Sequence, residues 1–140
     1  MKITLDDFAK MPTKAHFTDA GYDLYAREGL IIGAKESATI DTGVHVELPV
    51  GSVGFIKSRS GLMFKHEIIA GEGVIDCGFN GSIGVKLFNL GGRDYKVNAG
   101  DRIAQLVILP LANSYVGELE LVEQFEETER GSGGFGSSGY

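Results

Sequence analysis

The sequence predicts an all-β fold of many short strands for this chain of 140 residues. Short apolar or alternating runs rich in β-forming residues recur along the chain. Glycine, proline and asparagine turn signals separate these runs, and no window shows a sustained helical period with caps. Such spacing is typical of a sandwich, jelly roll or barrel. The length suggests one domain.

The predicted elements follow from these runs. The predicted strands are Glu36–Asp41, Val44–Leu48, Val53–Lys57, Ile68–Ile69, Ile83–Asn89, Arg102–Leu109 and Leu119–Val122. Turn signals lie at 42–43, 49–51, 80–81, 91–92 and 98–100. Asn80-Gly81 favours a two-residue hairpin of type I′. The best helical candidate is a turn or two near Ser60–His66.

The hydrophobic pattern stops near the acidic stretch 126–129, so we expect a β-rich domain over 1–126 and a flexible lid over 127–140. Half of the last ten residues are glycine. Glycine lets backbone N–H groups approach phosphate, Arg130 adds a charged fork, and Phe135 adds a ring on which a base can stack. A disordered linker is the alternative for the tail taken alone.

Composition narrows the setting and the partners. Cys77 is the single cysteine, which excludes an internal disulfide and fits an intracellular, cytoplasmic location, with nuclear and viral settings still open. The longest apolar run, Ile103–Pro110, is too short to span a membrane, and we expect no membrane partner. A net charge of −6 argues against stable nucleic-acid binding but allows a small phosphate ligand.

Five segments carry the candidate chemistry: Ala20–Leu24, Ser58–Leu62, Gly73–Gly81, Gly100–Leu106 and the tail. In this order and spacing they resemble the five motifs of the homotrimeric dUTP diphosphatases (dUTPases), over about Pro12 to Ser138. The resemblance implies a jelly-roll-like subunit, a homotrimer, and hydrolysis of dUTP to dUMP and pyrophosphate. That reaction would limit uracil in DNA and supply dUMP.

Asp76 ends an apolar triplet and precedes a turn, so its carboxylate should emerge at a strand end, where it could accept a proton from water. The rate acceleration would come mainly from positioning the water and from stabilising charge around the phosphates. An isolated aspartate before a turn usually serves the turn. The resemblance implies a catalytic Asp76. It also implies that Phe79, where relatives usually have tyrosine, packs on the deoxyribose and excludes a 2′-hydroxyl.

The segment from Val74 through Ile75 to Gly84 is predicted to form a hairpin whose backbone groups read the uracil edge. Cytosine would leave buried polar groups unpaired in such a pocket. Many relatives have an asparagine six residues before the aspartate. This chain has Ala70 there, so a contact at that point must come from the backbone.

Arg59, Ser60 and Gly61 are interpreted as a phosphate contact, with an N-cap beside a surface arginine as the alternative. Gln105 interrupts an apolar strand, so it is either a structural hydrogen bonder or a phosphate ligand. The resemblance favours the ligand. Asp101 and Arg102 are expected to stabilise a turn or a subunit contact.

The resemblance gives Asp23 an indirect supporting role near a metal. We expect Mg²⁺ to be carried by the triphosphate and waters, because the three histidines lack ligand spacing. In the tail, Arg130 would reach the terminal phosphate and Phe135 would stack on uracil. Gly136 and Ser137 would wrap the phosphates as the lid closes.

In this family each site draws on three chains. The resemblance therefore implies Asp76 and Phe79 from one subunit, Arg59–Gly61 and Gln105 from a second, and the tail from a third. A nucleotide-sensing regulatory protein on the same scaffold is the alternative function. A dCTP deaminase is a weaker rival, because this chain has Lys86 where that family has its catalytic glutamate.

Overall fold

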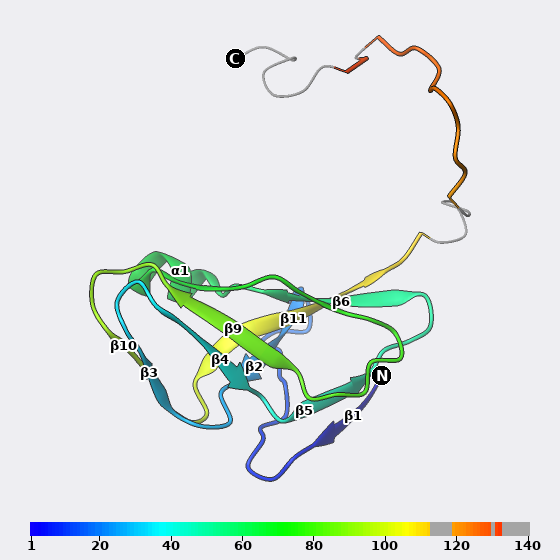
Figure 1. The fold of residues 1–140 in the computed structure, drawn as a ribbon. Coiled ribbons are helices and arrows are strands. Elements are labelled where there is room, and N and C mark those ends of the chain that lie inside the picture. Colours follow the sequence, from blue (N-terminus) through cyan, green and yellow to red (C-terminus); the bar gives the residue numbers. More distant parts are fainter. Residues whose placement is uncertain (113–118, 130, 133–140) are drawn as a thin grey trace.

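The computed structural model describes residues 1–112, 119–129 and 131–132, and its main body is built almost entirely from strands (Figure 1). Every strand pair is antiparallel. The elements are β1 (Lys2–Leu5), β2 (Gly21–Tyr25), β3 (Leu30–Ile32), β4 (Ser37–Asp41), β5 (Val44–Glu47), β6 (Ser52–Lys57), α1 (Ser60–His66), β7 (Ile68–Ala70), β8 (Gly73–Ile75), β9 (Gly84–Asn89), β10 (Tyr95–Val97) and β11 (Arg102–Pro110). The predicted all-β class is confirmed.

Two larger sheets enclose the core. One has the strand order β2–β11–β6–β8 and the other the order β4–β9–β7, while β1–β5 and β3–β10 form two-stranded sheets. Leu24, Ile56 and Leu106 of the first larger sheet share a buried cluster with Ile40 and Leu87 of the second. The apolar faces of both sheets therefore bury one another, which gives the jelly-roll-like arrangement.

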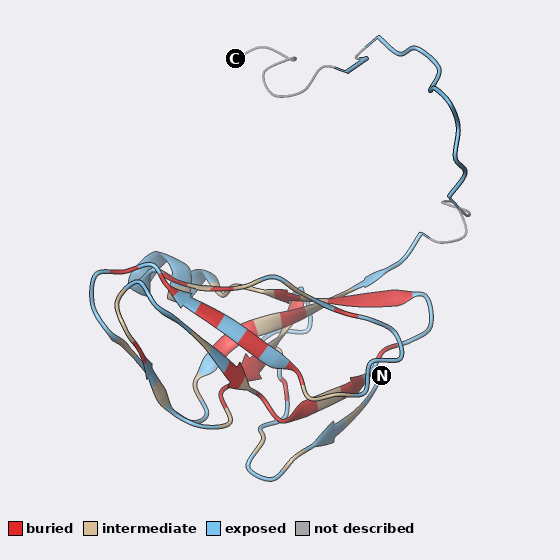
Figure 2. Cartoon of the chain, viewed as in Figure 1, coloured by how far each residue is buried: buried red, intermediate tan, exposed pale blue. Residues whose placement is uncertain are grey.

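Strand β9 shows most directly how the sequence pattern places residues. Val85, Leu87 and Asn89 are buried, whereas Lys86 and Phe88 are exposed, and Figure 2 shows the alternation along the strand. Successive side chains of a strand point to opposite faces, so an alternating sequence buries one face only. Lys86 consequently lies on the outer face.

The buried Asn89 fastens the β3–β10 end of the molecule to β9. Its Nδ2 donates to three main-chain carbonyls, those of Ile32, Gly33 and Arg93, at 3.0, 3.1 and 2.8 Å. Its Oδ1 accepts from the N–H of Gly91 at 2.9 Å. A buried amide with both ends satisfied fixes the surrounding loops, because a broken contact would leave a buried polar group unpaired.

Most predicted elements are confirmed. Strands lie within one or two residues of the predicted bounds for β4, β5, β6, β7, β9 and β11. The helical turn predicted near Ser60–His66 is α1. The turn signals at 42–43, 49–51, 91–92 and 98–100 all fall in connections between successive strands.

The strand predicted at Leu119–Val122 is wrong. These residues form no strand, and Leu119 and Leu121 are fully exposed (Figure 2). Alternation alone does not make a strand, because the backbone donors and acceptors also need a neighbouring strand. Strands β1, β2, β3 and β10 were not predicted, and β8 was predicted only as the strand that ends before Asp76. All five are short, and long-range pairing stabilises them. Among the residues described, no helix is long and apolar enough to cross a bilayer.

Candidate active site

Two arginines converge on Asp23 at one edge of the larger sheet. Nε of Arg59 donates to Oδ1 of Asp23 at 2.8 Å, and Nη1 of Arg102 donates to Oδ2 at 3.3 Å. The Asp23 side chain is only 17% exposed. Because both partners are charged and partly buried, these contacts are stronger than ordinary surface pairs. Three of the five sequence motifs therefore meet at this point.

Gln105 lies in the same region, opposite Asp23 on β2 and opposite Lys57 on β6. Its Nε2 donates to the main-chain carbonyl of Ser58 at 3.0 Å. Its Oε1 sits where a side chain on Gly21 would point, 2.6 Å from an ideal Cβ position, so only glycine fits there. The structural alternative predicted for Gln105 therefore describes its contact in this chain, and phosphate binding stays a prediction.

The start of α1 lies beside this cluster. Arg59 occupies the N-cap position with extended backbone, φ −93° and ψ 130°, and its side chain makes no capping bond. Ser60 and Gly61 form the exposed first turn, whose N–H groups have no partner within a helix. The alternative of Ser60 as an N-cap is wrong, because Arg59 holds that position. We call Asp23, Arg59, Ser60, Gly61, Arg102 and Gln105 the arginine group.

Ser58 anchors this segment in a way that the sequence did not indicate. Its Oγ accepts from the N–H of Ala70 at 2.9 Å and donates to the Ala70 carbonyl at 3.2 Å. These bonds join Ser58 to the backbone of Ala70 and link the strand end before α1 to β7. A backbone contact of Ala70 with the base stays a prediction.

Asp76 directly follows the buried Ile75 at the end of β8 and is exposed, as predicted. The N–H of Phe79 donates to the carbonyl of Asp76 at 3.1 Å and closes a turn. Gly78 has φ +99°, a backbone conformation that glycine adopts without steric cost. We call residues 76–83 the Asp76 loop.

The Phe79 ring is 43% exposed and lies against Gly81. A Cβ at Gly81 would stand 2.6 Å from Cζ of the ring, so a larger residue at this position would displace the Phe79 ring. Neither Asn80 nor Gly81 is among the described residues with positive φ. The predicted type I′ turn at these two residues is therefore wrong.

The predicted Val74–Gly84 hairpin is also wrong. Strand β8 pairs with β6, with Val74 opposite Phe55, whereas β9 pairs with β4, with Gly84 opposite Asp41. The two strands join different sheets because each buries its apolar side chains against a different partner. Val74 and Gly84 still border the two ends of the Asp76 loop, and both are exposed.

The arginine group and the Asp76 loop lie at opposite ends of β6. Ile75 pairs with Gly54, so Asp76 continues toward the start of β6, whereas Gln105 pairs with Lys57 at its end. Val53 and Arg59 lie six positions apart along this extended segment, which corresponds to a distance on the order of 20 Å. One chain therefore does not bring the predicted site residues together.

The remaining predictions concern the tail residues and a metal. Arg130, Phe135, Gly136 and Ser137 lie outside the described residues. Within the described ranges, histidine, cysteine and carboxylate side chains form no cluster of metal-ligating composition. Both oxygens of Asp23 accept hydrogen bonds from arginines, and its indirect role near a metal stays a prediction.

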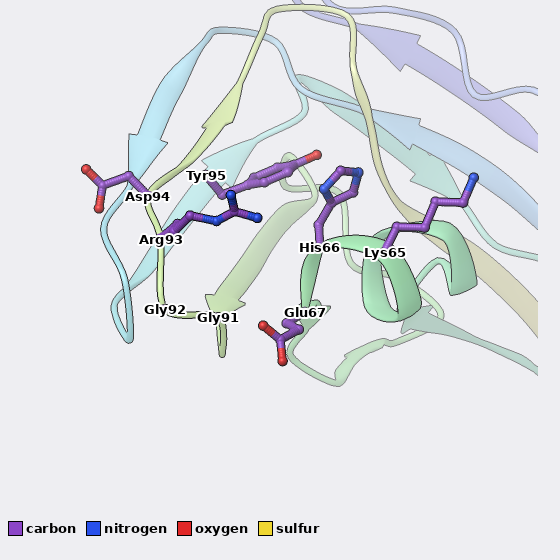
Figure 3. A pocket seen from close by; sticks show the side chains of 8 residues that line it. All are labelled: Lys65, His66, Glu67, Gly91, Gly92, Arg93, Asp94 and Tyr95. Carbon is purple, nitrogen blue, oxygen red and sulfur yellow. The ribbon is translucent and has the colours of Figure 1, made fainter.

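A cavity of about 280 Å³ lies elsewhere, between the end of α1 and the β9–β10 connection (Figure 3). The rings of His66 and Tyr95 stand 5.2 Å apart at its wall. None of the described residues that line it belongs to the predicted site. We do not assign this cavity as the active site, because the acidic and basic side chains that line it do not converge on one point.

Comparisons with known proteins extend this picture. A sequence model of the dUTPase family matches residues 7–139. The deoxyuridine 5′-triphosphate nucleotidohydrolase of Kluyveromyces lactis is 44% identical over 131 residues, covering 94% of this chain and 87% of the relative.

Solved structures agree. A dUTPase of Staphylococcus bacteriophage 80alpha with dUPNHPP superposes with a TM-score of 0.90 at 35% identity, covering 99% of this chain and 98% of the other. A mutant dUTPase of phage phi11 of S. aureus, described with a structural Mg(II) ion, has a TM-score of 0.80 at 33% identity, with 90% and 98% covered. The sequence and the fold together establish that the chain belongs to the dUTPase family.

Proposed function

We propose that this protein hydrolyses dUTP to dUMP and pyrophosphate. The observation that carries the proposal is the exposed Asp76 at the end of β8, beside Phe79, in a chain of the dUTPase family. The named relatives are nucleotidohydrolases, so the regulatory alternative is not favoured. Lys86 on the outer face of β9 does not supply the glutamate that deamination would need.

In the proposed reaction, Asp76 orients a water molecule and accepts its proton as the water oxygen bonds to the α-phosphorus. The bond from that phosphorus to the α–β bridging oxygen breaks, and pyrophosphate leaves with the electron pair. An exposed carboxylate is a weak base, so most of the acceleration must come from positioning and from cations around the phosphates.

Substrate selection is assigned to the Asp76 loop and its borders. Main-chain groups of Val74, Ile75 and Gly84 would read the uracil edge, and the Phe79 ring would pack on the deoxyribose. The half-exposed ring, backed by Gly81, is available for such a contact. A 2′-hydroxyl would meet the ring, so we expect discrimination against UTP to be steric.

A homotrimer would complete the site. Asp76 and Phe79 of one subunit would face Arg59, Ser60, Gly61 and Gln105 of a second, with the tail of a third above them. The separation along β6 supports this arrangement, because a single chain leaves the two groups on the order of 20 Å apart. The assembly would bring together two incomplete halves.

The segment 127–140 is proposed as a lid, separate from the β-rich domain of 1–126. Arg130 would bind the terminal phosphate, Phe135 would cover the base, and Gly136 and Ser137 would wrap the phosphates. Closure would exclude all water except the attacking molecule.

Magnesium is proposed as the cofactor, held by the triphosphate and waters. Asp23, held by Arg59 and Arg102, is the described side chain that would support the ion indirectly. When bound, the ion would neutralise phosphate charge. We place the protein inside the cell, where its single cysteine suits a reducing setting.

Pyrophosphate release by the purified protein with magnesium tests the function, with dUTP compared against dTTP, dCTP and UTP. We expect rapid release from dUTP alone. Equal rates with UTP would contradict the assigned role of Phe79. Binding of dUTP without release would contradict the enzymatic proposal.

A further inference from the structure

The Asp76 loop is hydrogen-bonded to the body of the protein at Ser82 and Ile83, but residues 76–81 have few polar contacts with it. Among described residues, two side-chain contacts join residues 76–81 to the rest: Sγ of Cys77 lies 3.7 Å from the carbonyl of Leu48, and a ring nitrogen of His45 lies 2.8 Å from the carbonyl of Asn80. A thiol is a weak donor, so the His45 contact is the stronger tie. His45 sits on β5, opposite Thr4 of β1.

The two partners of His45 determine its protonation state. Nδ1 faces the main-chain carbonyl of Asn80 at 2.8 Å, and Nε2 faces Oδ1 of Asp6 at 3.1 Å. A carbonyl and a carboxylate can only accept, so both ring nitrogens must donate. Only the imidazolium form satisfies both contacts at once.

The charges around His45 favour that form. Asp6 is in direct contact and Asp41 adds a second negative field, while Arg27 bridges these carboxylates at 3.0 Å from each. The hydrogen bond to the Asn80 carbonyl is the largest cause that raises the pKa of His45 above its ordinary value; desolvation opposes the shift, and the hydrogen bond and charge of Asp6 add to it. The side chain remains 26% exposed, so solvent protons reach it.

His45 and Asn80 line a shallow cavity of about 270 Å³, and the charged Lys2–Glu47 pair lines it as well. Nζ of Lys2 lies 3.1 Å from Glu47, so the two charges largely offset each other. On the other side of the loop, Ser82 donates to Asp41. The network thus holds the Asp76 loop at Asn80 and at Ser82.

We infer that His45 is a positioning residue for the Asp76 loop: as an imidazolium it holds the Asn80 carbonyl, and through it sets the placement of Phe79 and Asp76. This inference rests on the proposed dUTP hydrolysis for its functional readout. The sequence distance of 35 residues between His45 and Asn80 hides the contact from any local motif.

The direction of the pH dependence follows from the contacts. When His45 loses a proton, the one remaining N–H donates to the negative Asp6 in preference to the neutral carbonyl, because a charged acceptor is stronger. The Nδ1 lone pair then faces the Asn80 oxygen, and the tie to the loop is lost. The Asn80 carbonyl is held below the folded-state pKa of His45, and this contact is lost as the pH rises through that pKa, while the contacts at Ser82 and Ile83 remain.

Two neutral amide substitutions separate the two contacts. In His45→Asn, the amide nitrogen occupies the place of Nδ1 and keeps the donor to Asn80. In His45→Gln, it occupies the place of Nε2 and reaches Asp6 instead. We expect kcat/KM for dUTP within about twofold of wild type for His45→Asn and a loss of about tenfold for His45→Gln. The two melting temperatures should be similar.

The pH profile and NMR complete the test. The ratio of wild-type to His45→Asn kcat/KM, which cancels titration of the substrate, should fall as pH rises through the His45 pKa. In the wild-type protein without nucleotide, both ring nitrogens should carry protons at low pH, and the Gly81 amide shift should follow their titration.

Equal kcat/KM for the Asn and Gln variants, or a Gly81 shift that ignores the His45 titration, would overturn the inference. Absence of dUTP hydrolysis would overturn the proposed function alone, because the NMR titration needs no substrate. A folded-state pKa of His45 at or below the ordinary histidine value would also contradict the imidazolium assignment.

Discussion

Nε of Arg59 donates a hydrogen bond to Oδ1 of Asp23 at 2.8 Å, although 36 residues separate them in the chain. The contact holds the arginine side chain over the edge of the four-stranded sheet, beside the start of α1. Arg102 holds the other carboxylate oxygen. One acidic side chain therefore fixes two cations near the proposed phosphate site.

Replacing Asp23 by asparagine should cost about 1–2 kcal/mol in the free energy of unfolding, because the partly buried Arg59 and the more exposed Arg102 lose a charged acceptor. We also expect kcat/KM for dUTP to fall about tenfold as Arg59 loses its orientation. Urea unfolding at fixed protein concentration measures the first effect. The control is Glu47→Gln, which breaks the exposed Lys2–Glu47 pair and should change stability by less than about 0.5 kcal/mol. Equal losses of unfolding free energy in the two variants would contradict the proposal that Asp23 holds both arginines.

Asp76→Asn should abolish turnover while leaving dUTP affinity within about threefold, since the amide keeps the shape but cannot accept the proton. Asp76 is exposed and makes no contact that folding needs, so the melting temperature should not change. Single-turnover kinetics and calorimetric titration measure the two quantities. Normal turnover would remove Asp76 from the mechanism.

Mixing two inactive variants tests the shared site. Asp76→Asn and Arg59→Ala should each be inactive alone, because each lacks one half of every site. Unfolding and refolding them together in equal amounts should restore about a quarter of wild-type activity, the fraction of sites that combine two intact halves. A mixture that stays inactive would place both halves within one chain.

Deleting residues 130–140 should leave a folded protein with the wild-type oligomeric mass and very little activity, because the lid would no longer exclude water or bind the phosphates. Light scattering and pyrophosphate release provide the measurements. Deleting Tyr140 alone serves as the control. Full activity in the longer truncation would refute the lid.

Acid stability should depend on Asp41. Burial alone would raise the pKa of Asp41, but hydrogen bonds from Ser82, Gly43 and Arg27 outweigh it and the pKa is lowered. A lowered folded-state pKa gives stability that is present above an unfolded pKa of about 3.9 and is lost as pH falls through the folded value. Asp41→Asn should flatten the stability profile in this acidic range. An unaltered acid limb in urea titrations would contradict the assignment.

Local features of this protein follow from the sequence alone. The alternation along β9, the apolar run in β11, the helical turn at Ser60–His66 and the exposed carboxylate after β8 all depend on the residues in each segment. The five motifs also identify the family from the sequence, because their order and spacing are properties of the linear chain. These features could be predicted because strand period and turn chemistry act over a few residues.

Which segments meet became clear only from the folded chain. The fold places β8 and β9 in different sheets where the sequence predicted a hairpin, and it leaves Leu119–Val122 without a strand partner among the described residues. It also brings Arg59 to Asp23 and His45 to Asn80. Such pairings depend on which buried faces fit together after long loops close, and no local pattern encodes that choice.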